Sequence, residues 1–402
     1  MAKSFSLSIV AVSRLLIVLA LQIDSSTLIG DDTVIDDPVL AKARFFKDER
    51  AVFFDVTFSG KTFSFLIDTG STGIWIDKKH SDLCTNKLSV RQVREAFGSD
   101  RTIQTFSIED FCIGKLRIAN CEVATADLSE SQRMRGKVID GVLGNNVLSE
   151  SVLQIDHDAG LVRLLKHYQP EPGERVERFS LHQGCPVTRL GVTSEFTDAL
   201  IDTGNYYGVS LAPALFEEMT SKRLLLLQPK KNYLGKYKSE NRTMFFLKQV
   251  DFGGFSHENV EGLGANYSTV GMAVLSQFRL TLDYPNRRLY LKESADAKST
   301  ILPDASGVSW GKDESGIVVV DIEQSSPAFE AGLEIGDRLM RVNDQLIETK
   351  RLAEVRHMFS DAGKLVRVEL NRGNETYSKE FKLRRTFPYP PVWPHKLSKT
   401  LD

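Results

Sequence analysis

The run Leu-Ile-Asp-Thr-Gly occurs twice in this chain of 402 residues, beginning at Leu66 and again at Leu200, 134 positions later. At average residue frequencies, an Asp-Thr-Gly string is expected about 0.1 times in a chain of this length. Two copies with the same preceding Leu-Ile therefore indicate an internal duplication.

A second pair of similar segments follows the two copies in the same order. GNNVLSESVLQIDHDAGLVRLL begins at Gly144 and GMAVLSQFRLTLDYPNRRLYL begins at Gly271, 127 positions later. Each segment has Val-Leu-Ser three residues after the Gly, and an Asp twelve residues after it. The chain is therefore predicted to contain two homologous lobes, over residues 45–168 and 180–293.

Alternating apolar residues predict that each lobe consists mainly of strands. Residues 52–58 and 63–67 alternate around a Ser-Gly-Lys turn, and this hairpin leads directly into Asp68. Residues 199–201 lead into Asp202 in the same manner. Each aspartate is therefore expected at the end of a buried strand.

Two helices are predicted within the lobes. SVRQVREAF begins at Ser89, and APALFEEMT begins at Ala212 with Pro213 near its start. Proline is favoured in the first turn of a helix, where its missing N–H has no intrahelical acceptor.

The two Asp-Thr-Gly loops have a chemical consequence when they lie on pseudo-symmetric lobes. Glycine accepts unusual torsion angles and lets backbone N–H groups approach the carboxylate. Two carboxylates that meet at one axis cannot both ionise easily, so they share one proton. The ionised member can then activate a water molecule while the protonated member hydrogen-bonds a carbonyl group under attack.

These motifs resemble the aspartic peptidases of the pepsin and retropepsin kind over about residues 50–293. The motifs are IDTGSTGIW, IDTGNYYGV, the hydrophobic-hydrophobic-Gly elements IDGVLG and STVGMAVL, and FRLTLDYPNRRLYL. The resemblance implies a mostly β, two-lobed acid-protease fold with pseudo-twofold β-barrel lobes. Because one chain supplies both aspartates, it also implies a monomer. It assigns Asp68 and Asp202 as catalytic, supported by Thr69, Gly70, Ser71, Thr203, Gly204 and Asn205, with Ser71 as the outer hydrogen-bond partner.

Two features depart from the pattern of this family. Asn205 stands where Ser, Thr or Ala is usual, and no Tyr occurs between Phe97 and Phe111, where the family has a flap Tyr. A hairpin near residues 98–106 is expected to cover the cleft, with Phe97 or Phe106 as its apolar lid. A hairpin near residues 233–241 is expected to close the other side, and Trp75 to line the cleft or the core.

A third domain is predicted over residues 305–386, after a polar linker over residues 294–304. Strands are expected over residues 317–322 and 338–342, with a short helix from Ser326-Pro327-Ala328 to Gly332 between them. A helix containing Leu352, Val355 and Phe359 on one face and a hairpin about Arg372-Gly373 complete the pattern.

This third segment resembles a small α+β PDZ domain of the kind found in bacterial periplasmic proteases. The resemblance implies an extended peptide that adds as a strand beside a helix, with its C-terminal carboxylate held by backbone N–H groups. The carboxylate loop is expected at Gly307, Val308, Ser309 and Trp310, with Gly316 as an alternative, and Leu352 and Val355 are expected to line the groove. In the alternative interpretation, the domain packs on the peptidase and binds nothing.

Both ends of the chain carry distinct signals. Residues 1–25 combine Lys3 with an apolar run that is too short for a plain membrane span, and are typical of a signal peptide or an uncleaved anchor. Export to the periplasm, the cell surface or the medium is the expectation. Residues 387–402 are rich in proline and favour an extended tail that lies along the body, lies in a groove or stays mobile.

Composition excludes several other classes of function. A net charge of −2 gives no indication of a nucleic-acid partner, and none is predicted. The His and Cys spacings match no metal motif, so neither a metal nor a cofactor is predicted. Four cysteines are expected to form one or two disulfides or to be buried thiols: Cys84, Cys112, Cys121 and Cys185.

The sequence therefore predicts an aspartic endopeptidase whose PDZ domain recruits polypeptide or C-terminal peptides. The alternative is a catalytically silent peptide-binding scaffold with the same fold. A PDZ-bearing serine protease is excluded, because no G-x-S-x-G nucleophile motif with suitable partners is present.

Overall fold

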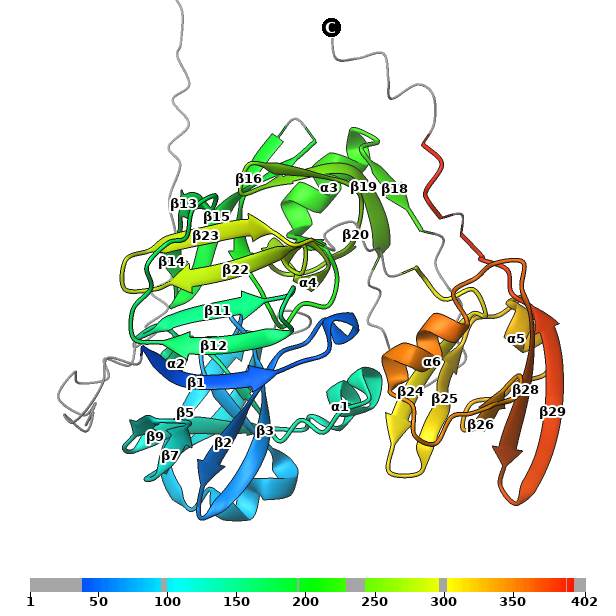
Figure 1. Cartoon of the computed structure of the whole chain (residues 1–402), viewed down its shortest axis with the longest axis horizontal. Helices are drawn as coiled ribbons and strands as arrows, with labels where there is room; N and C mark the ends of the chain where they lie inside the picture. Colours follow the sequence, from blue (N-terminus) through cyan, green and yellow to red (C-terminus); the bar gives the residue numbers. More distant parts are fainter. Residues whose placement is uncertain are drawn as a thin grey trace, which may run out of the picture.

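The structure is a computed structural model that describes residues 38–94, 100–193, 195–228, 243–295, 302–387 and 389–393. Two β-rich lobes lie one above the other in Figure 1, and a smaller C-terminal domain lies beside them. The mostly β, two-lobed fold with an additional PDZ domain is confirmed. The expected signal segment over residues 1–25 and the hairpin near residues 233–241 lie outside the described residues.

The first lobe is built on one twisted sheet in which short hairpins follow each other along the chain. Phe54, Val56 and Phe58 alternate inward as predicted, and the turn at Ser59-Gly60 has positive φ at both residues. The strand order is β5-β6-β9-β4-β10-β3-β2-β7-β8. The bounds are β2 (Phe53–Phe58), β3 (Lys61–Ile67), β4 (Ile74–Asp77), β5 (Asn86–Arg94), β6 (Asp100–Ile108), β7 (Phe111–Ile113), β8 (Leu116–Ile118), β9 (Cys121–Ala126) and β10 (Gly141–Leu143).

The second lobe repeats this architecture with the strand order β14-β15-β16-β21-β17-β20-β19-β18. Its bounds are β14 (Ser180–His182), β15 (Cys185–Val192), β16 (Glu195–Ile201), β17 (Val209–Leu211), β18 (Leu225–Leu227), β19 (Met244–Phe252), β20 (Phe255–Gly264) and β21 (Thr269–Val270). β10 and β21 occupy equivalent positions, because each pairs in parallel with the strand that leads to an Asp-Thr-Gly loop.

A third sheet joins the two lobes. Its order is β1 (Val39–Arg44), β12 (Leu161–Leu165), β11 (Val152–Asp156), β22 (Phe278–Asp283), β23 (Arg288–Glu293) and β13 (Arg175–Arg178). At its centre, Gln154 of β11 lies opposite Thr281 of β22 in antiparallel register. These two residues are also equivalents in the 127-residue repeat, so the pseudo-twofold axis passes between them.

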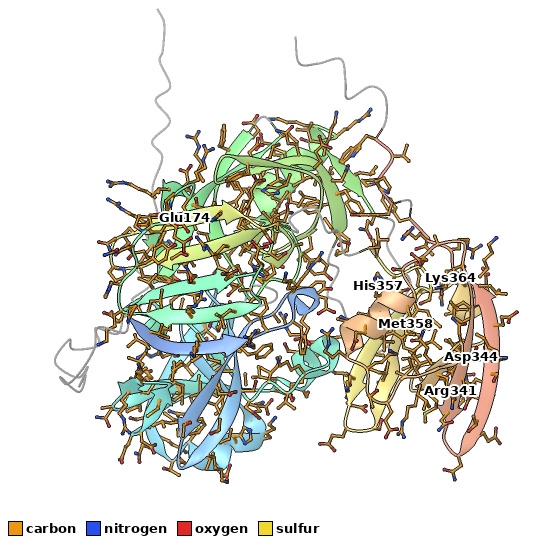
Figure 2. The ribbon with its side chains drawn as sticks, viewed as in Figure 1. Glu174, Arg341, Asp344, His357, Met358 and Lys364 are labelled. Carbon is orange, nitrogen blue, oxygen red and sulfur yellow. The ribbon has the colours of Figure 1, made fainter. Side chains whose placement is uncertain are left out.

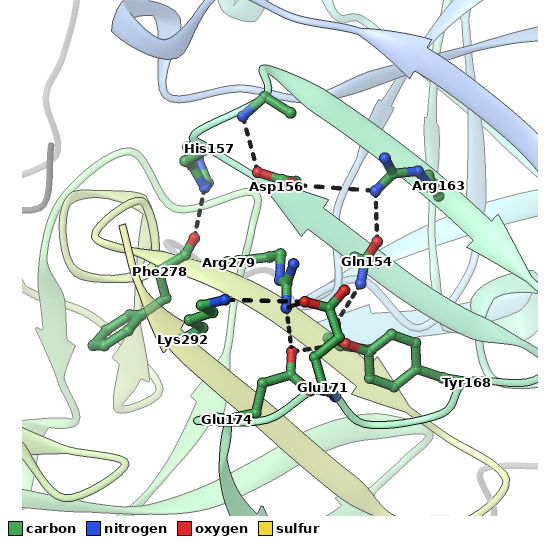
Figure 3. Close-up of polar contacts among 12 residues, drawn as sticks. Gln154, Asp156, His157, Arg163, Tyr168, Glu171, Glu174, Phe278, Arg279 and Lys292 are labelled. Atoms are coloured by element: carbon green, nitrogen blue, oxygen red, sulfur yellow. Dashed lines mark hydrogen bonds and ion pairs between the residues drawn. The ribbon is translucent and has the colours of Figure 1, made fainter. Parts of the chain in front are cut away.

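Side-chain hydrogen bonds reinforce this joining sheet (Figure 3). Gln154 Nε2 donates to Thr281 Oγ1 at 3.1 Å across the axis, and Arg163 Nη1 donates to Gln154 Oε1 at 2.6 Å. Arg279 Nη2 donates to Glu174 Oε1 at 2.9 Å, where the Glu174 side chain is fully buried. Buried polar groups that are paired in this way avoid the free-energy penalty of desolvation.

The two lobes share one hydrophobic core, and the C-terminal domain has its own. Phe58 stacks on Phe63 with ring centroids 4.2 Å apart, and Trp310 stacks on Phe359 at 4.9 Å. Fully burying one such side chain stabilises a fold by roughly 1.5–3 kcal/mol. The C-terminal domain therefore has a core independent of the lobes.

The helices are short and connect strands. Their bounds are η2 (Lys47–Glu49), η3 (Lys78–Leu83), α1 (Ser129–Arg135), α2 (Asn145–Leu148), α3 (Pro213–Ser221), α4 (Met272–Leu275), α5 (Pro327–Glu330) and α6 (Leu352–Met358). The helix predicted from Ala212 is confirmed as α3, with Pro213 at its start.

The helix predicted from Ser89 is wrong, because residues 89–94 belong to strand β5, and the rest of the predicted helix lies outside the described residues. β5 pairs with β6 along most of its length, and Val90, 65% exposed, lies opposite Gln104. Backbone pairing with β6 and the β-branched Val90 and Val93 favour the strand over the local helical pattern.

The predicted elements of the C-terminal domain are confirmed. Ser326 is the N-cap of α5, and its Oγ accepts a hydrogen bond from Phe329 N at 3.3 Å. Gly332 and Gly373 both have positive φ, at the end of the short helix and at the predicted hairpin. The strand order is β24-β25-β26-β28-β29, with β27 beside β26. The bounds are β24 (Val308–Asp313), β25 (Gly316–Ile322), β26 (Arg338–Val342), β27 (Gln345–Leu346), β28 (Leu365–Arg372) and β29 (Glu375–Lys382).

The C-terminal domain lies against the first lobe through α1, which is close to β24 and α6 in Figure 1. In Figure 2, His357 and Met358 of α6 lie on the side of the domain nearer the lobes, whereas Arg341 and Asp344 lie on the far side. Arg351 forms an ion pair with Asp48 of η2, with Nη1 2.5 Å from Oδ1. Its guanidinium also lies 4.0 Å from the ring centroid of Phe46.

The described part of the proline-rich tail lies along the second lobe. Phe387 stacks on Phe246 with centroids 5.7 Å apart, and Trp393 Nε1 donates to Asn259 Oδ1 at 2.8 Å. Pro391 is buried. Of the arrangements that the sequence left open, the structure has the tail lying along the body up to Trp393.

All four cysteines are free thiols, and Cys84, Cys121 and Cys185 are buried. The expectation of buried thiols therefore fits this structure better than that of disulfides. Within the described residues, the helices are all too short or too polar to cross a membrane.

Candidate active site

The two Asp-Thr-Gly loops begin where β3 and β16 end. Asp68 N donates to the carbonyl of Leu143 at 3.0 Å, and Asp202 N donates to the carbonyl of Val270 at 2.9 Å. Leu143 ends β10 and Val270 ends β21, so the two hydrophobic-hydrophobic-Gly motifs hold the two aspartates in equivalent ways.

The two loops are tied together by reciprocal threonine hydrogen bonds at the lobe interface. Thr69 N donates to Thr203 Oγ1 at 3.1 Å, and Thr203 N donates to Thr69 Oγ1 at 3.0 Å. Each hydroxyl then donates to the backbone of the opposite lobe, Thr69 to Ile201 O at 2.5 Å and Thr203 to Ile67 O at 2.8 Å. Both threonines are 0% exposed, so every one of these polar groups is paired inside the protein.

The glycines of the loops let each loop approach the carboxylate of the other lobe. A Cβ atom on Gly70 would lie 2.6 Å from Asp202 Cγ, and a Cβ on Gly204 would lie 2.4 Å from Asp68 Cγ. Neither contact is possible for a side chain, which explains the need for glycine at both positions. The two carboxyl groups lie within hydrogen-bond reach of each other.

Electrostatics favour one proton shared by this pair. Burial raises the pKa of both aspartates, and the neighbouring charge of Asp68 raises the pKa of Asp202 further, well above its usual range. The Gly70 N–H, donating to Asp68 Oδ1 at 2.9 Å, opposes the rise at Asp68. These directions favour a pair that shares one proton.

Ser71 differs from the role that the family resemblance implied, whereas Asn205 supports the second loop. The Ser71 hydroxyl donates to Gly73 O at 3.0 Å and accepts from Trp75 Nε1 at 3.2 Å, so it stabilises its own loop instead of a carboxylate. Asn205 N donates to Asp202 Oδ1 at 3.0 Å, and its Nδ2 donates to Thr269 Oγ1 at 2.8 Å. The side chain of Asn205 thereby fixes the second loop to β21.

Asn145, the first residue of α2, is a supporting residue that sequence reasoning missed. Its Nδ2 donates to Thr69 O at 2.6 Å and Ser71 O at 2.8 Å, and its Oδ1 accepts from Tyr284 OH at 2.7 Å. In the repeat, its equivalent is Met272, which cannot make these bonds. This asymmetry between the two copies was the signal that would have identified it.

Arg135, the last residue of α1, was also missed. Its Nη2 donates to the carbonyl of Gly204 at 2.7 Å, although α1 belongs to the first lobe and Gly204 to the second. In the sequence nothing distinguishes Arg135 from Arg133, because only the packing of α1 brings it to the loop.

The residues predicted to line the substrate cleft have separate locations. Trp75 lies in β4, is partly buried and packs against a small buried cluster that includes Phe53 and Leu66. Phe106 lies in β6 and packs against the core of the lobes, so the lid function expected for it is not supported. Phe97 lies outside the described residues.

The predicted peptide-binding residues of the C-terminal domain are largely covered. Gly307 N donates to Asp304 Oδ1 at 2.9 Å and Val308 N to Ser306 Oγ at 3.2 Å, so both of these N–H groups have internal acceptors. Ser309 is partly exposed, and the alternative residue Gly316 closes the β24–β25 hairpin.

The apolar groove residues are buried instead of open. Trp310, Leu352 and Val355 are 1%, 2% and 0% exposed. Leu352 contacts the backbone of Gly136, just after α1, so the first lobe covers the expected groove at this residue.

The two lobes and their paired loops form a two-lobed acid-protease fold, and a separate small domain follows it at the C-terminal end. Residues 54–147 match the family described as Aspartyl protease, and residues 305–383 match the PDZ domain family. The chain therefore carries an aspartyl protease domain and a C-terminal PDZ domain. A comparison with curated proteins gives no match. Among the described residues, His, Cys, Asp and Glu form no group suited to a metal ion.

Proposed function

We propose that this protein is a monomeric, exported aspartic endopeptidase in which Asp68 and Asp202 activate one water molecule between them. The observation that carries the proposal is the reciprocal Thr69–Thr203 bonding, which holds two carboxyl groups together at the pseudo-twofold axis. The matches to an aspartyl protease and a PDZ domain support the same class of activity.

In this mechanism, ionised Asp68 removes a proton from the water as its oxygen attacks the peptide carbonyl. Protonated Asp202 donates a hydrogen bond to the carbonyl oxygen, on which negative charge develops. When the tetrahedral intermediate collapses, the proton gained by Asp68 passes to the leaving nitrogen and the C–N bond breaks. The pair returns to its state with one proton, and no covalent intermediate forms.

The directions of the pKa shifts set the expected pH range. Activity requires Asp68 to be ionised, and burial raises its pKa, so the acid limit lies above about pH 4. Activity also requires the proton on Asp202, whose pKa is raised well above its usual range, so the upper limit extends toward neutrality. We therefore expect a bell-shaped pH profile whose acid limb lies above the usual pKa of an aspartate and whose upper limb lies at a higher pH still.

The experiment is digestion of an unfolded polypeptide from pH 3 to 7, with and without a statine-type inhibitor. Asp68→Asn and Asp202→Asn should each lower kcat by about 10²–10⁴-fold, and the double variant should lose little more, because the pair acts as one unit. The control is Asp198→Asn, an exposed carboxylate on β16, the strand that leads to Asp202. Wild-type protein that binds the inhibitor and cleaves nothing would identify the silent peptide-binding scaffold.

The PDZ domain is proposed to bind polypeptide, which the family match supports. β24 is an edge strand, so it can accept a peptide as an additional strand once its outer edge is uncovered.

A further inference from the structure

The C-terminal end of α1 contacts the second active-site loop and the PDZ domain at once. At the loop, Arg135 Nη2 donates to Gly204 O at 2.7 Å. Gly204 is the residue that packs on Asp68 and donates its N–H to Asp202 Oδ1 at 2.9 Å. A first-lobe arginine therefore holds the second-lobe residue that touches both carboxylates.

The charge of Arg135 acts on the catalytic pair, chiefly on Asp68. Burial lowers the pKa of Arg135, and Asp68, Tyr206 and Asp202 oppose that effect. Arg135 forms no ion pair with another carboxylate in the described part of the chain, and its Nη1 is buried without a hydrogen-bond partner there. A buried cation without a dedicated counter-ion is costly, so the catalytic pair is the group that offsets its charge.

The same segment is fixed to the PDZ domain on its other side. Arg356 of α6 donates from Nη2 to Met134 O at 2.7 Å and to Trp310 O at 2.8 Å. A Cβ atom on Gly136 would lie 2.5 Å from Leu352 Cβ, and one on Gly311 would lie 2.9 Å from Arg133 Cγ. Residues 133–136 therefore lie against both β24 and α6.

We propose that Arg135 is a positioning residue of the catalytic centre and that the docked PDZ domain holds it there. The PDZ domain is then part of the support of the active site as well as a candidate peptide-binding module. This inference rests on the proposed function, because it assigns a role in the same reaction. Arg135 orients the Gly204 carbonyl and favours the ionised form of Asp68, while Arg356 anchors the backbone of the preceding residue, Met134.

Other ionisable groups also lie near the catalytic pair, and their charge must stay constant over the pH range of the test. The groups that act on the pair or on Arg135 are Tyr206, Arg356, Cys185 and Tyr284. Burial raises the pKa of Cys185 to about 12 and raises the pKa of Tyr284 well above its usual range, so both remain neutral over the pH range of the assay.

The first test measures the carboxyl ¹³C shifts of Asp68 and Asp202 against pH in the full chain, with assignments from Asp68→Asn and Asp202→Asn. Arg135→Gln should raise the pKa of the ionised member by about one unit, which lowers kcat/KM about tenfold on the acid side. Arg135→Lys keeps the positive charge, so it should raise this pKa by a smaller amount. The control Lys137→Gln removes a positive charge two residues further along, where it lies 3.7 Å from Glu49, and should change nothing. An unchanged carboxyl titration in folded Arg135→Gln protein would overturn the proposal.

The second test asks whether the PDZ domain holds Arg135. Arg356→Gln should shift both the carboxyl titration and the acid limb of the pH–rate profile in the same direction as Arg135→Gln, by a smaller amount. Combined with Arg135→Gln it should add no further shift, because both changes act through one contact. An unshifted Arg356→Gln titration would show that the first lobe alone positions Arg135. If Arg135→Gln fails to fold, Arg356→Gln decides the question, since it leaves Arg135 in the chain.

The titration also separates this inference from the proposed function. Wild-type protein that cleaves no polypeptide would refute the proposed function. The carboxyl shifts would still decide whether Arg135 acts on the pair.

Discussion

At the scale of single residues, the catalytic pair imposes a pH-dependent cost on the fold. Burial, followed by the charge of Asp68, raises the pKa of Asp202 well above its usual range. Below the pKa of an unfolded aspartate, both states of the protein hold the proton and no penalty exists. As the pH rises through the native pKa, the unfolded chain releases its proton more readily, so stability is lost.

Asp202→Asn is therefore expected to stabilise the protein at neutral pH while it removes activity. Asparagine cannot ionise and keeps an oxygen to accept from Gly204 N and Asn205 N. The gain should be near zero at about pH 3.5 and should grow toward pH 7 by about 1.4 kcal/mol for each unit by which the native pKa is raised. Urea denaturation at the two pH values measures it. A gain of equal size at both would refute this assignment of the shared proton.

At the scale of elements, α2 and α4 show how a duplication can keep its geometry and change its chemistry. Both helices follow a glycine at the end of a strand that supports an aspartate. In the first lobe, α2 begins with Asn145, whose side chain is hydrogen-bonded to Thr69 and Ser71. In the second lobe, α4 begins with Met272, and Asn205 makes the side-chain contact from the loop instead.

Asn145→Ala should accordingly destabilise the protein by about 2–4 kcal/mol, because it leaves the buried Thr69 carbonyl and the Tyr284 hydroxyl without partners. The neighbouring Asn146 provides a matched control on the same helix. Its Nδ2 has only a 3.4 Å contact to Glu122 O, so Asn146→Ala should cost less than about 1 kcal/mol. Chemical denaturation of both variants compares them, and equal losses would contradict the role given to Asn145.

Sequence patterns predicted the elements that are determined by residues close to one another in the chain. The Leu-Ile-Asp-Thr-Gly runs, the partner strands and the α5 cap depend on neighbouring residues and were recognised correctly. The strand β5 was mistaken for a helix, because its pairing with β6 outweighs local preference. Arg135 could not be predicted from one-dimensional patterns, since its partner lies 69 positions away. Asn145 was missed, although the difference from Met272 in the second copy marks it in the sequence.

At the scale of the whole molecule, the tail connects the PDZ domain to the second lobe. Trp393→Ala removes the hydrogen bond to Asn259 and should release the segment that follows the Phe387–Phe246 stack. We expect a loss of about 1–2 kcal/mol and faster exchange of the amide hydrogens at positions 389, 392 and 393. The control is Val392→Ala, because Val392 is 71% exposed and should change stability by less than about 0.5 kcal/mol. Identical exchange in the two variants would show that Trp393 does not hold the tail.

The position of the PDZ domain limits how the two lobes of the peptidase can move apart. The PDZ domain is bound to the first lobe by the Arg351–Asp48 ion pair. The tail that follows the domain is bound to the second lobe, where Phe387 stacks on Phe246. Any movement that separates the lobes must lengthen this bridge or break one of its ends. The Arg351–Asp48 pair is partly exposed and therefore screened by dissolved ions. High ionic strength should therefore weaken this connection, so that the two lobes of the peptidase separate further and more often in concentrated salt.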